Sequence, residues 1–418
     1  MRTKKPLLVV VAPLAFAACA LPVDGETEGG RSPRPGGSAP SSPSASLPPR
    51  APDGRPGPGL GPPTATLEEP AALPPIAAGW SDMGEVVLFD ALDGEVLSAA
   101  PGADLGGERD LVVDPWLSRL IVFEGDSEDP WGEVALYPLV PSVGDGASGA
   151  GGADGADGVA LGPREHEVWV DGTARLAASP SGAVLFEESY GARWRLVRAD
   201  GVPSASVAAP RPASIATDLL PDGRLRVTAL TYGFSGDDAD MRVAVVGPEG
   251  IDTPVAVPLS TPPVSMPLGA RWVQSADGGH LVDVASGDVV LSTVAGGGWP
   301  ALAPVGVGPG IVGVEQAAVF PGGERLALLT SGAVDLVVVG LGSGGAPECA
   351  AGLDLPGEVE AAGLFFARGL AIVGADRLLV ATTGGVAAVT VSDDCPPLLE
   401  VDAGFDGSAL RGPLGMWP

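Results

Sequence analysis

Short apolar segments recur along this chain at a nearly constant spacing. Comparable segments begin near residues 85, 133, 193, 241, 288, 334 and 386, which gives steps of 48, 60, 48, 47, 46 and 52. The long step contains a Gly/Asp/Ala-rich insertion at 144–158, and discounting its 15 residues returns that step to 45. A period in the forties is the length of a four-stranded repeat. The spacing therefore predicts a repeat fold in which each unit needs neighbours to bury its apolar surfaces.

The recurring segments have the length and composition of β-strands. They are runs of Val, Leu, Ile, Phe and Ala bounded by Gly, Pro or Asp, as at 85–89, 119–123, 242–246 and 377–381. After Trp80, no window sustains a helical period over three turns. The sequence predicts one all-β domain over residues 76–418.

A second marker precedes the spaced strands: an apolar strand, a tight Pro/Asp/Gly turn and another strand. It occurs at 177–186, 218–227 and 318–327, with looser copies at 113–116 and 275–278. Pro presets such a turn and Gly supplies a positive φ, so each copy predicts a hairpin. These hairpins resemble the Ser-Pro-Asp-Gly hairpin of WD40-like and YVTN-like β-propellers. The resemblance covers residues 80–418 and implies a single β-propeller of seven four-stranded blades, with six blades as the alternative.

The family's strand order implies how the ring closes. The hairpin joins the innermost strand of a blade to the second, and the spaced strands are third. Six full blades then run from about 109 to 401, which leaves strands near Glu85 and Val96 at one end and 409–416 at the other. Together these build the seventh blade, and sharing it between both ends removes open sheet edges.

Residues 1–18 have the pattern of a secretory signal peptide. A basic start with Lys4 and Lys5 is followed by an apolar run at 7–15 and by small residues. Residues 16–19, which end in Cys19, resemble the lipobox of bacterial lipoproteins. The resemblance implies that the Cys19 sulfur carries lipid and anchors the protein to a membrane of the cell envelope. Ordinary cleavage after Ala17, giving a secreted protein, is the alternative.

Residues 19–75 are rich in Pro, Gly and Ser and contain few large apolar side chains, which predicts a disordered tether. The formal charge of the chain is -29, and removing residues 1–18 deletes Arg2, Lys4, Lys5 and no acid, which gives -32. Such an acidic chain is a poor partner for nucleic acid, and self-repulsion favours a soluble monomer.

Two cysteines remain after Cys19. Cys349 and Cys395 are 46 residues apart, close to one repeat, so they are expected on neighbouring units. In an oxidising compartment this predicts a disulfide. Two buried free thiols are the alternative.

The candidate binding residues lie in two acidic loops that connect second to third strands, two blades apart on one face. Flexible loops with several carboxylates suit Ca²⁺, and the aromatic residues among them suit a ligand or partner. Solvated acidic turns are the alternative. The candidates are Asp126, Glu128, Asp129, Trp131, Tyr232, Phe234, Asp237, Asp238 and Asp240.

Catalytic motifs are not evident in this sequence. The chain has two histidines, His166 and His280, in different repeats, and no nucleophile elbow or phosphate-binding loop stands out. We therefore expect no enzyme and no cofactor other than Ca²⁺ at the acidic loops. The predicted function is that of a non-catalytic envelope lipoprotein whose propeller binds a protein or glycan partner or scaffolds an assembly. The alternative is a metal-dependent propeller hydrolase or lactonase.

Overall fold

The computed structural model describes residues 75–103, 106–126, 131–141, 159–188, 192–210, 212–232, 239–257, 271–275, 278–285, 288–294, 311–332, 334–342, 345–355 and 369–416. The predicted signal peptide, Cys19, nearly all of the predicted tether and the insertion at 144–158 lie outside these ranges. In the described ranges the chain contains no helix that is long and apolar enough to cross a membrane.

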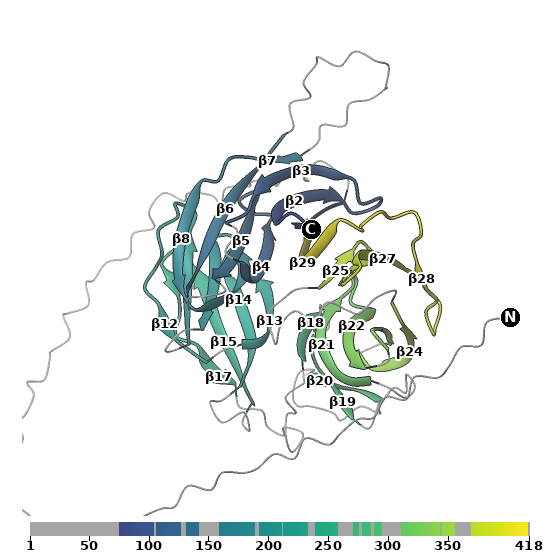
Figure 1. The fold of residues 1–418 in the computed structure, drawn as a ribbon. Helices are drawn as coiled ribbons and strands as arrows, with labels where there is room; N and C mark the ends of the chain where they lie inside the picture. Colours follow the sequence, from purple (N-terminus) through teal and green to yellow (C-terminus); the bar gives the residue numbers. More distant parts are fainter. Residues whose placement is uncertain are drawn as a thin grey trace, which may run out of the picture. The chain divides into compact units, whose positions relative to one another are not determined.

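The described residues form seven antiparallel sheets, called blades 1 to 7 here (Figure 1). Blade 1 is shared between the two ends of the domain, as predicted, and contains β29 (Leu410–Met416), β1 (Ile76–Ser81), β2 (Glu85–Asp90) and β3 (Val96–Pro101). Blade 2 contains β4 (Gly106–Asp114), β5 (Arg119–Asp126) and β6 (Trp131–Pro141), with β7 (Val159–Leu161) and β8 (His166–Asp171) both paired to β6. Blade 3 contains β9 (Thr173–Ser179), β10 (Gly182–Glu188), β11 (Arg193–Arg198) and β12 (Val207–Ala208).

The remaining blades repeat the same order. Blade 4 contains β13 (Pro212–Leu219), β14 (Leu225–Tyr232) and β15 (Ala239–Gly247), with β16 (Gly250–Ile251) and β17 (Val255–Val257) both on β15. Blade 5 contains β18 (Arg271–Ser275), β19 (Gly278–Ala285) and β20 (Asp288–Val294). Blade 6 contains β21 (Ile311–Val319), β22 (Arg325–Gly332), β23 (Leu336–Leu341) and β24 (Pro347–Leu353). Blade 7 contains β25 (Leu370–Val373), β26 (Arg377–Thr382), β27 (Gly385–Val391) and β28 (Leu399–Val401).

The blades follow one another around a common axis. Contacts join the first strands of successive blades, β29 to β4, β4 to β9, β13 to β18, β18 to β21, β21 to β25 and β25 to β29. The all-β propeller is therefore confirmed, with seven blades. Each spaced strand of the sequence is the third strand of its blade, and each predicted hairpin joins a first strand to a second. In blades 2 and 4 a second short segment pairs with the third strand, and blade 5 has three strands in the described part of the chain.

The continuous apolar runs have a simple cause, since both faces of each blade are covered by a neighbouring blade. In β2, Val87 and Phe89 join the cluster shared with blade 7, whereas Val86 and Leu88 join the cluster shared with blade 2. The strand β22 shows the same alternation, because Leu326 and Leu328 face blade 5 and Ala327 and Leu329 face blade 7. Alternate side chains of a strand point to opposite faces, so a doubly covered strand is apolar at every position.

Arginines at one repeat position tie blades 2, 6 and 7 to the blades that follow them. Arg119, Arg325 and Arg377 each begin the second strand of a blade and precede a buried leucine. Their guanidinium groups donate to backbone carbonyls of the following blade: Arg119 Nη1 to Ala199 at 3.3 Å, Arg325 Nη1 to Ser392 at 2.9 Å and Arg377 Nη2 to Leu92 at 2.6 Å. Arg224 has the same place in blade 4, but it pairs with Asp222 of its own turn at 2.7 Å.

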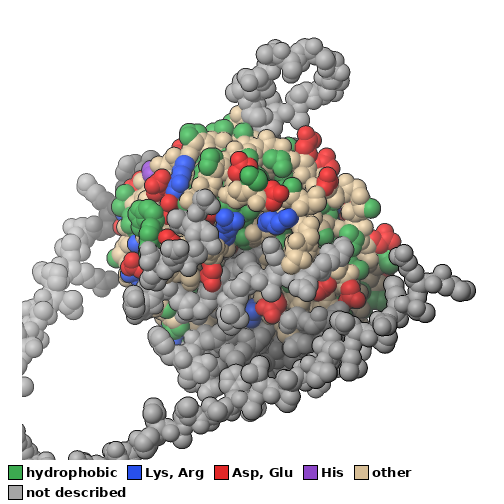
Figure 2. Space-filling model, in the orientation of Figure 1, with side chains coloured by type: hydrophobic (Ala, Val, Ile, Leu, Met, Phe, Trp, Pro, Cys, Tyr) green, Lys and Arg blue, Asp and Glu red, His purple; other side chains and the backbone are tan. Residues whose placement is uncertain are grey.

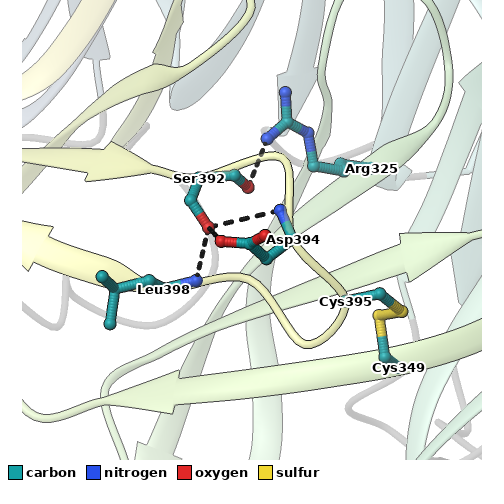
Figure 3. Close-up of a disulfide and its surroundings, with 6 residues drawn as sticks. All are labelled: Arg325, Cys349, Ser392, Asp394, Cys395 and Leu398. Atoms are coloured by element: carbon teal, nitrogen blue, oxygen red, sulfur yellow. Dashed lines mark hydrogen bonds between the residues drawn. A yellow bond between two sulfur atoms is a disulfide. The ribbon is translucent and has the colours of Figure 1, made fainter.

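A disulfide joins blades 6 and 7. Cys349 lies on β24 and Cys395 in the loop between β27 and β28, with their Cα atoms 5.7 Å apart (Figure 3). Ser392 folds that loop, because its Oγ accepts from the amides of Asp394 at 3.3 Å and Leu398 at 2.9 Å. The Arg325 side chain donates to the carbonyl of Ser392 in the same loop. A covalent bond and an arginine therefore hold the same pair of blades together.

We expect the disulfide to stabilise the fold, since it closes a loop of 46 residues. Replacing both Cys349 and Cys395 with Ser should lower the free energy of unfolding by about 2–4 kcal/mol. Urea denaturation with and without dithiothreitol measures this. The reductant should lower the unfolding midpoint of the wild type to that of the double variant and leave the variant unchanged. Equal midpoints for oxidised wild type and variant would contradict the prediction.

The substitution Arg325→Met keeps the aliphatic stem and removes the donors to blade 7. We expect it to lower the free energy of unfolding by about 1.5–3 kcal/mol, because hydrogen bonds from a charged donor are lost and carbonyls lose their partner. Arg224→Met is the matched control at the same repeat position and should leave the free energy of unfolding unchanged, since among the described residues Arg224 bonds to Asp222 of its own turn and to no other blade. Urea denaturation measures both variants. Equal shifts in both variants would count against the role assigned to Arg325.

Candidate active site

A cavity of about 410 Å³ lies among the first strands of the blades. Its polar lining residues come from blades 3 to 6, and in the described part of the chain blades 7, 1 and 2 line it with apolar side chains. The polar group consists of Arg175, Ser214, Thr217, Arg271, Glu315 and Gln316. The apolar group is Val112, Val113, Pro115, Trp116, Leu370 and Met416. The cavity thus has one charged side and one apolar side.

Arg271 and Glu315 form the charged centre of this cavity. Arg271 begins β18 and is buried, whereas Glu315 lies in the middle of β21 with half of its side chain exposed. The Nε atom of Arg271 donates to the Glu315 carbonyl at 2.7 Å, and Nη2 lies 4.0 Å from the Glu315 carboxylate. A buried guanidinium therefore stands beside a carboxylate that solvent reaches.

Buried acceptors on the preceding blade position the two cavity arginines. Ser214 Oγ accepts a hydrogen bond at 2.7 Å from the amide of Trp272, the residue that follows Arg271. In the same way, Asp110 Oδ2 accepts a hydrogen bond at 2.9 Å from the amide of Leu176, the residue that follows Arg175. Both bonds join first strands of adjacent blades and are buried. They fix the backbone from which each arginine reaches the cavity.

The turn that carries Trp116 is held by Asp114. Its Oδ1 atom accepts from the amides of Trp116 at 3.0 Å and Leu117 at 3.1 Å, and its Oδ2 atom lies 3.5 Å from Arg119 Nε. Burial raises the pKa of Asp114, and the backbone donors and the Arg119 charge oppose that rise. The side chain of Trp116 is thereby held at the apolar side of the cavity.

This arrangement can polarise and hydrolyse a small polar molecule. A guanidinium stabilises negative charge that develops on a carbonyl oxygen, and a carboxylate can accept a proton from water. The volume falls within the range of small-molecule sites. Among the described residues, no group of three or more His, Cys, Asp and Glu side chains has an arrangement suited to a metal ion.

The structure describes only part of the residues predicted from the acidic loops. The loops do connect second to third strands in blades 2 and 4, β5 to β6 and β14 to β15. Asp126 ends β5 and is half-buried, and Trp131 begins β6 and packs on Trp169 with ring centroids 4.5 Å apart. Tyr232 and Asp240 are placed only by their backbone. The other candidates, Glu128, Asp129, Phe234, Asp237 and Asp238, lie outside the described residues.

Asp126 and Trp131 do not line the cavity, and the calcium site stays a prediction. Figure 2 shows acidic side chains at several separate places on the described surface. His166 begins β8 and does not line the cavity, and His280 lies within β19. The sequence analysis missed Arg175, Arg271 and Glu315. The signal for all three was a charged residue within an apolar first strand.

Comparisons with solved structures show that other proteins share this fold. No protein-family model matches the chain, and no curated protein matches it. The solved periplasmic gluconolactonase of Pseudomonas aeruginosa is similar at a TM-score of 0.53 and 20% identity, over 82% of this chain and 99% of that one. A putative 6-phosphogluconolactonase from Bacteroides fragilis has a TM-score of 0.53 and 14% identity, over 82% and 98%. A putative 6-phosphogluconolactonase from Bacteroides uniformis has a TM-score of 0.54 and 13% identity, over 82% of this chain and 100% of that one.

These comparisons correct the predicted function. From the sequence we predict a non-catalytic binding protein and no enzyme, and both predictions are wrong. The similar structures are named as lactonases, which agrees with the alternative of a propeller hydrolase. The error has a physical reason: histidines and nucleophile motifs are recognisable in a sequence, whereas the charged residues at the axis are arginines and a glutamate from separate strands. At these identities the likeness itself shows the fold.

Proposed function

We propose that the protein is a hydrolase of sugar lactones that acts in the central cavity. The observation that carries the proposal is the Arg271–Glu315 pair, a buried cation beside an accessible carboxylate in a cavity of small-molecule size. The names of the structures with the same fold, gluconolactonase and 6-phosphogluconolactonase, support this substrate class.

The proposed reaction opens the lactone ring with one water. The Glu315 carboxylate accepts a proton as the water oxygen attacks the ring carbonyl carbon. The Arg271 guanidinium stabilises the negative charge on the carbonyl oxygen. The bond between the carbonyl carbon and the ring oxygen then breaks, and Glu315 returns the proton to that oxygen. The product is the open-chain hydroxy acid.

The two sides of the cavity orient the substrate. Arg175, Thr217 and Gln316 offer polar groups to the hydroxyls or to an anionic substituent of the lactone. The apolar side, with Trp116 and Leu370, packs against the carbon–hydrogen face of the ring. Because the arginine backbones are held from the preceding blade, the positive charges stand in place before substrate binds.

Glu315→Gln tests this mechanism. We expect it to lower kcat for glucono-1,5-lactone or 6-phosphoglucono-1,5-lactone by about 10²–10⁴-fold, because the amide cannot accept the proton. Hydrolysis above the spontaneous rate is followed by pH-stat titration. Glu324→Gln, in the turn after β21 and outside the cavity lining, is the matched control and should keep the wild-type rate. A Glu315→Gln variant with wild-type activity, or a wild type inactive on both lactones, would refute the proposal.

The N-terminal segment supports a proposed location for the enzyme. The lipobox-like residues 16–19 and the Pro/Gly/Ser-rich residues 19–75 support a protein tethered to an envelope membrane through lipid on Cys19. A similar structure is named as a periplasmic enzyme, which is compatible with this location.

The substitution Cys19→Ala should release the protein from the membrane fraction, since it removes the sulfur that carries the lipid. Mass spectrometry of the mature wild-type protein should show an N-terminus at Cys19 with added diacylglycerol. Cys349→Ala is the matched control and should leave the protein in the membrane fraction. An unmodified N-terminus at Ala18 or Cys19 would indicate a secreted protein.

A further inference from the structure

Three exposed side chains form a row along the strand β8 of blade 2. Glu167, Trp169 and Asp171 alternate with the buried Val168 and Val170. Side chains two apart on a strand share a face, so the three point to the same side. From Glu167 to Asp171 the row spans about 13 Å, at about 3.3 Å per residue. It is therefore longer than one sugar ring.

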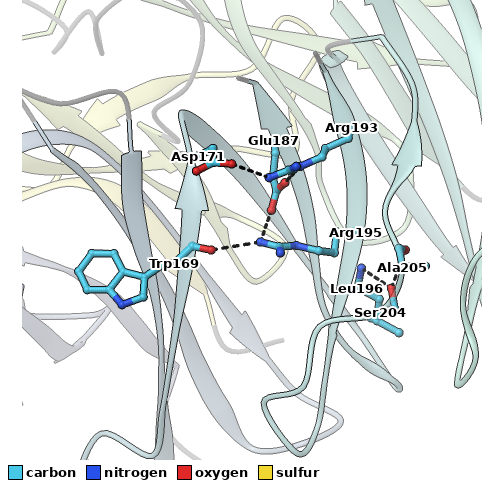
Figure 4. Close-up of polar contacts among 8 residues, drawn as sticks. All are labelled: Trp169, Asp171, Glu187, Arg193, Arg195, Leu196, Ser204 and Ala205. Carbon is cyan, nitrogen blue, oxygen red and sulfur yellow. Dashed lines mark hydrogen bonds and ion pairs between the residues drawn. The ribbon is translucent and has the colours of Figure 1, made fainter. Parts of the chain in front are cut away.

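An indole occupies the centre of this row. Trp169 is 53% exposed, although a tryptophan is the side chain that gains most from burial. Its ring lies against that of Trp131, which begins the neighbouring strand β6, with centroids 4.5 Å apart and planes inclined by 60°. Arg195 Nη2 donates to the Trp169 carbonyl at 3.3 Å (Figure 4). The exposed ring is thus held by a second ring and by blade 3.

Each carboxylate of the row has a guanidinium beside it. Arg164 Nε lies 3.3 Å from the Glu167 carboxylate, and Arg193 Nη2 lies 3.4 Å from Asp171. Arg193 is itself anchored by the buried Glu187, which also pairs with Arg195 (Figure 4). Arg164 also pairs with the buried Glu133, so each of these two guanidinium groups is shared between an exposed and a buried carboxylate. The row therefore offers donors beside acceptors and no isolated charge.

We propose that this row is a binding site for a neutral oligosaccharide, separate from the central cavity. A pyranose ring has a flat carbon–hydrogen face that packs on an indole, and Trp169 presents that surface. Its hydroxyls both donate and accept, and each carboxylate–guanidinium pair offers an acceptor next to donors. The site lies on β8, which contributes no residue to the cavity, so the inference stands independently of the proposed hydrolase activity.

The test is a binding assay on the purified protein with defined hexasaccharides. The neutral probes are cellohexaose, maltohexaose and the hexamer of N-acetylglucosamine, and the charged probes are hexagalacturonate and the glucosamine hexamer. Isothermal titration calorimetry reports affinity. We expect at least one neutral probe to bind and the charged probes to bind more weakly.

Trp169→Ala should weaken that binding about tenfold or more, as loss of a stacking indole does. Trp169→Phe keeps an aromatic face and should retain most of the affinity, which separates stacking from a folding defect. Leu398→Ala removes an equally exposed apolar side chain of blade 7 and is the matched control. The proposal is overturned if no neutral hexasaccharide binds, if affinity survives in Trp169→Ala, or if a charged probe binds more tightly through Trp169.

Discussion

Each central strand of a blade is covered on both faces, and the two covering surfaces belong to different neighbours. The alternation of Val87 and Phe89 with Val86 and Leu88 in β2 shows this arrangement in four residues. A single blade on its own would therefore expose both of its apolar faces to water, and the hydrogen bonds within its sheet would not offset that cost. The only arrangement that leaves no blade with an uncovered face is a closed ring, so the ring is a consequence of how the strands alternate.

The polar contacts build on that apolar packing. Arginine side chains such as Arg325 and Arg377 bond to carbonyls of the next blade, and Ser214 bonds to an amide near the axis. These bonds set the rotation and height of a blade relative to its neighbour, which apolar packing alone leaves loosely specified. The candidate catalytic charges sit on the strands that are held in this way. Hydrogen bonds that join neighbouring blades therefore also fix the positions of the charged residues at the axis.

Much of the fold could be predicted from the sequence, because period and turn chemistry are local properties. The third strands and the hairpins stand where the spacing and the Pro/Asp/Gly turns put them. The strand β1 was not identified, since Ile76–Ser81 is mostly small residues and is buried by its neighbours. The site could not be predicted. Arg271 and Glu315 contact each other because β18 and β21 lie side by side at the axis. The distance between these two strands is not encoded in the sequence around either residue.

The seam of the ring lies in blade 1, where β29 pairs with β1. Its strand β29 is the innermost of that sheet and also contacts β4 and β25, on either side. A ribosome makes residues 410–416 after every other strand in the circle. Until residues 410–416 join the sheet, the inner edge of β1 therefore has no strand partner and the circle stays open.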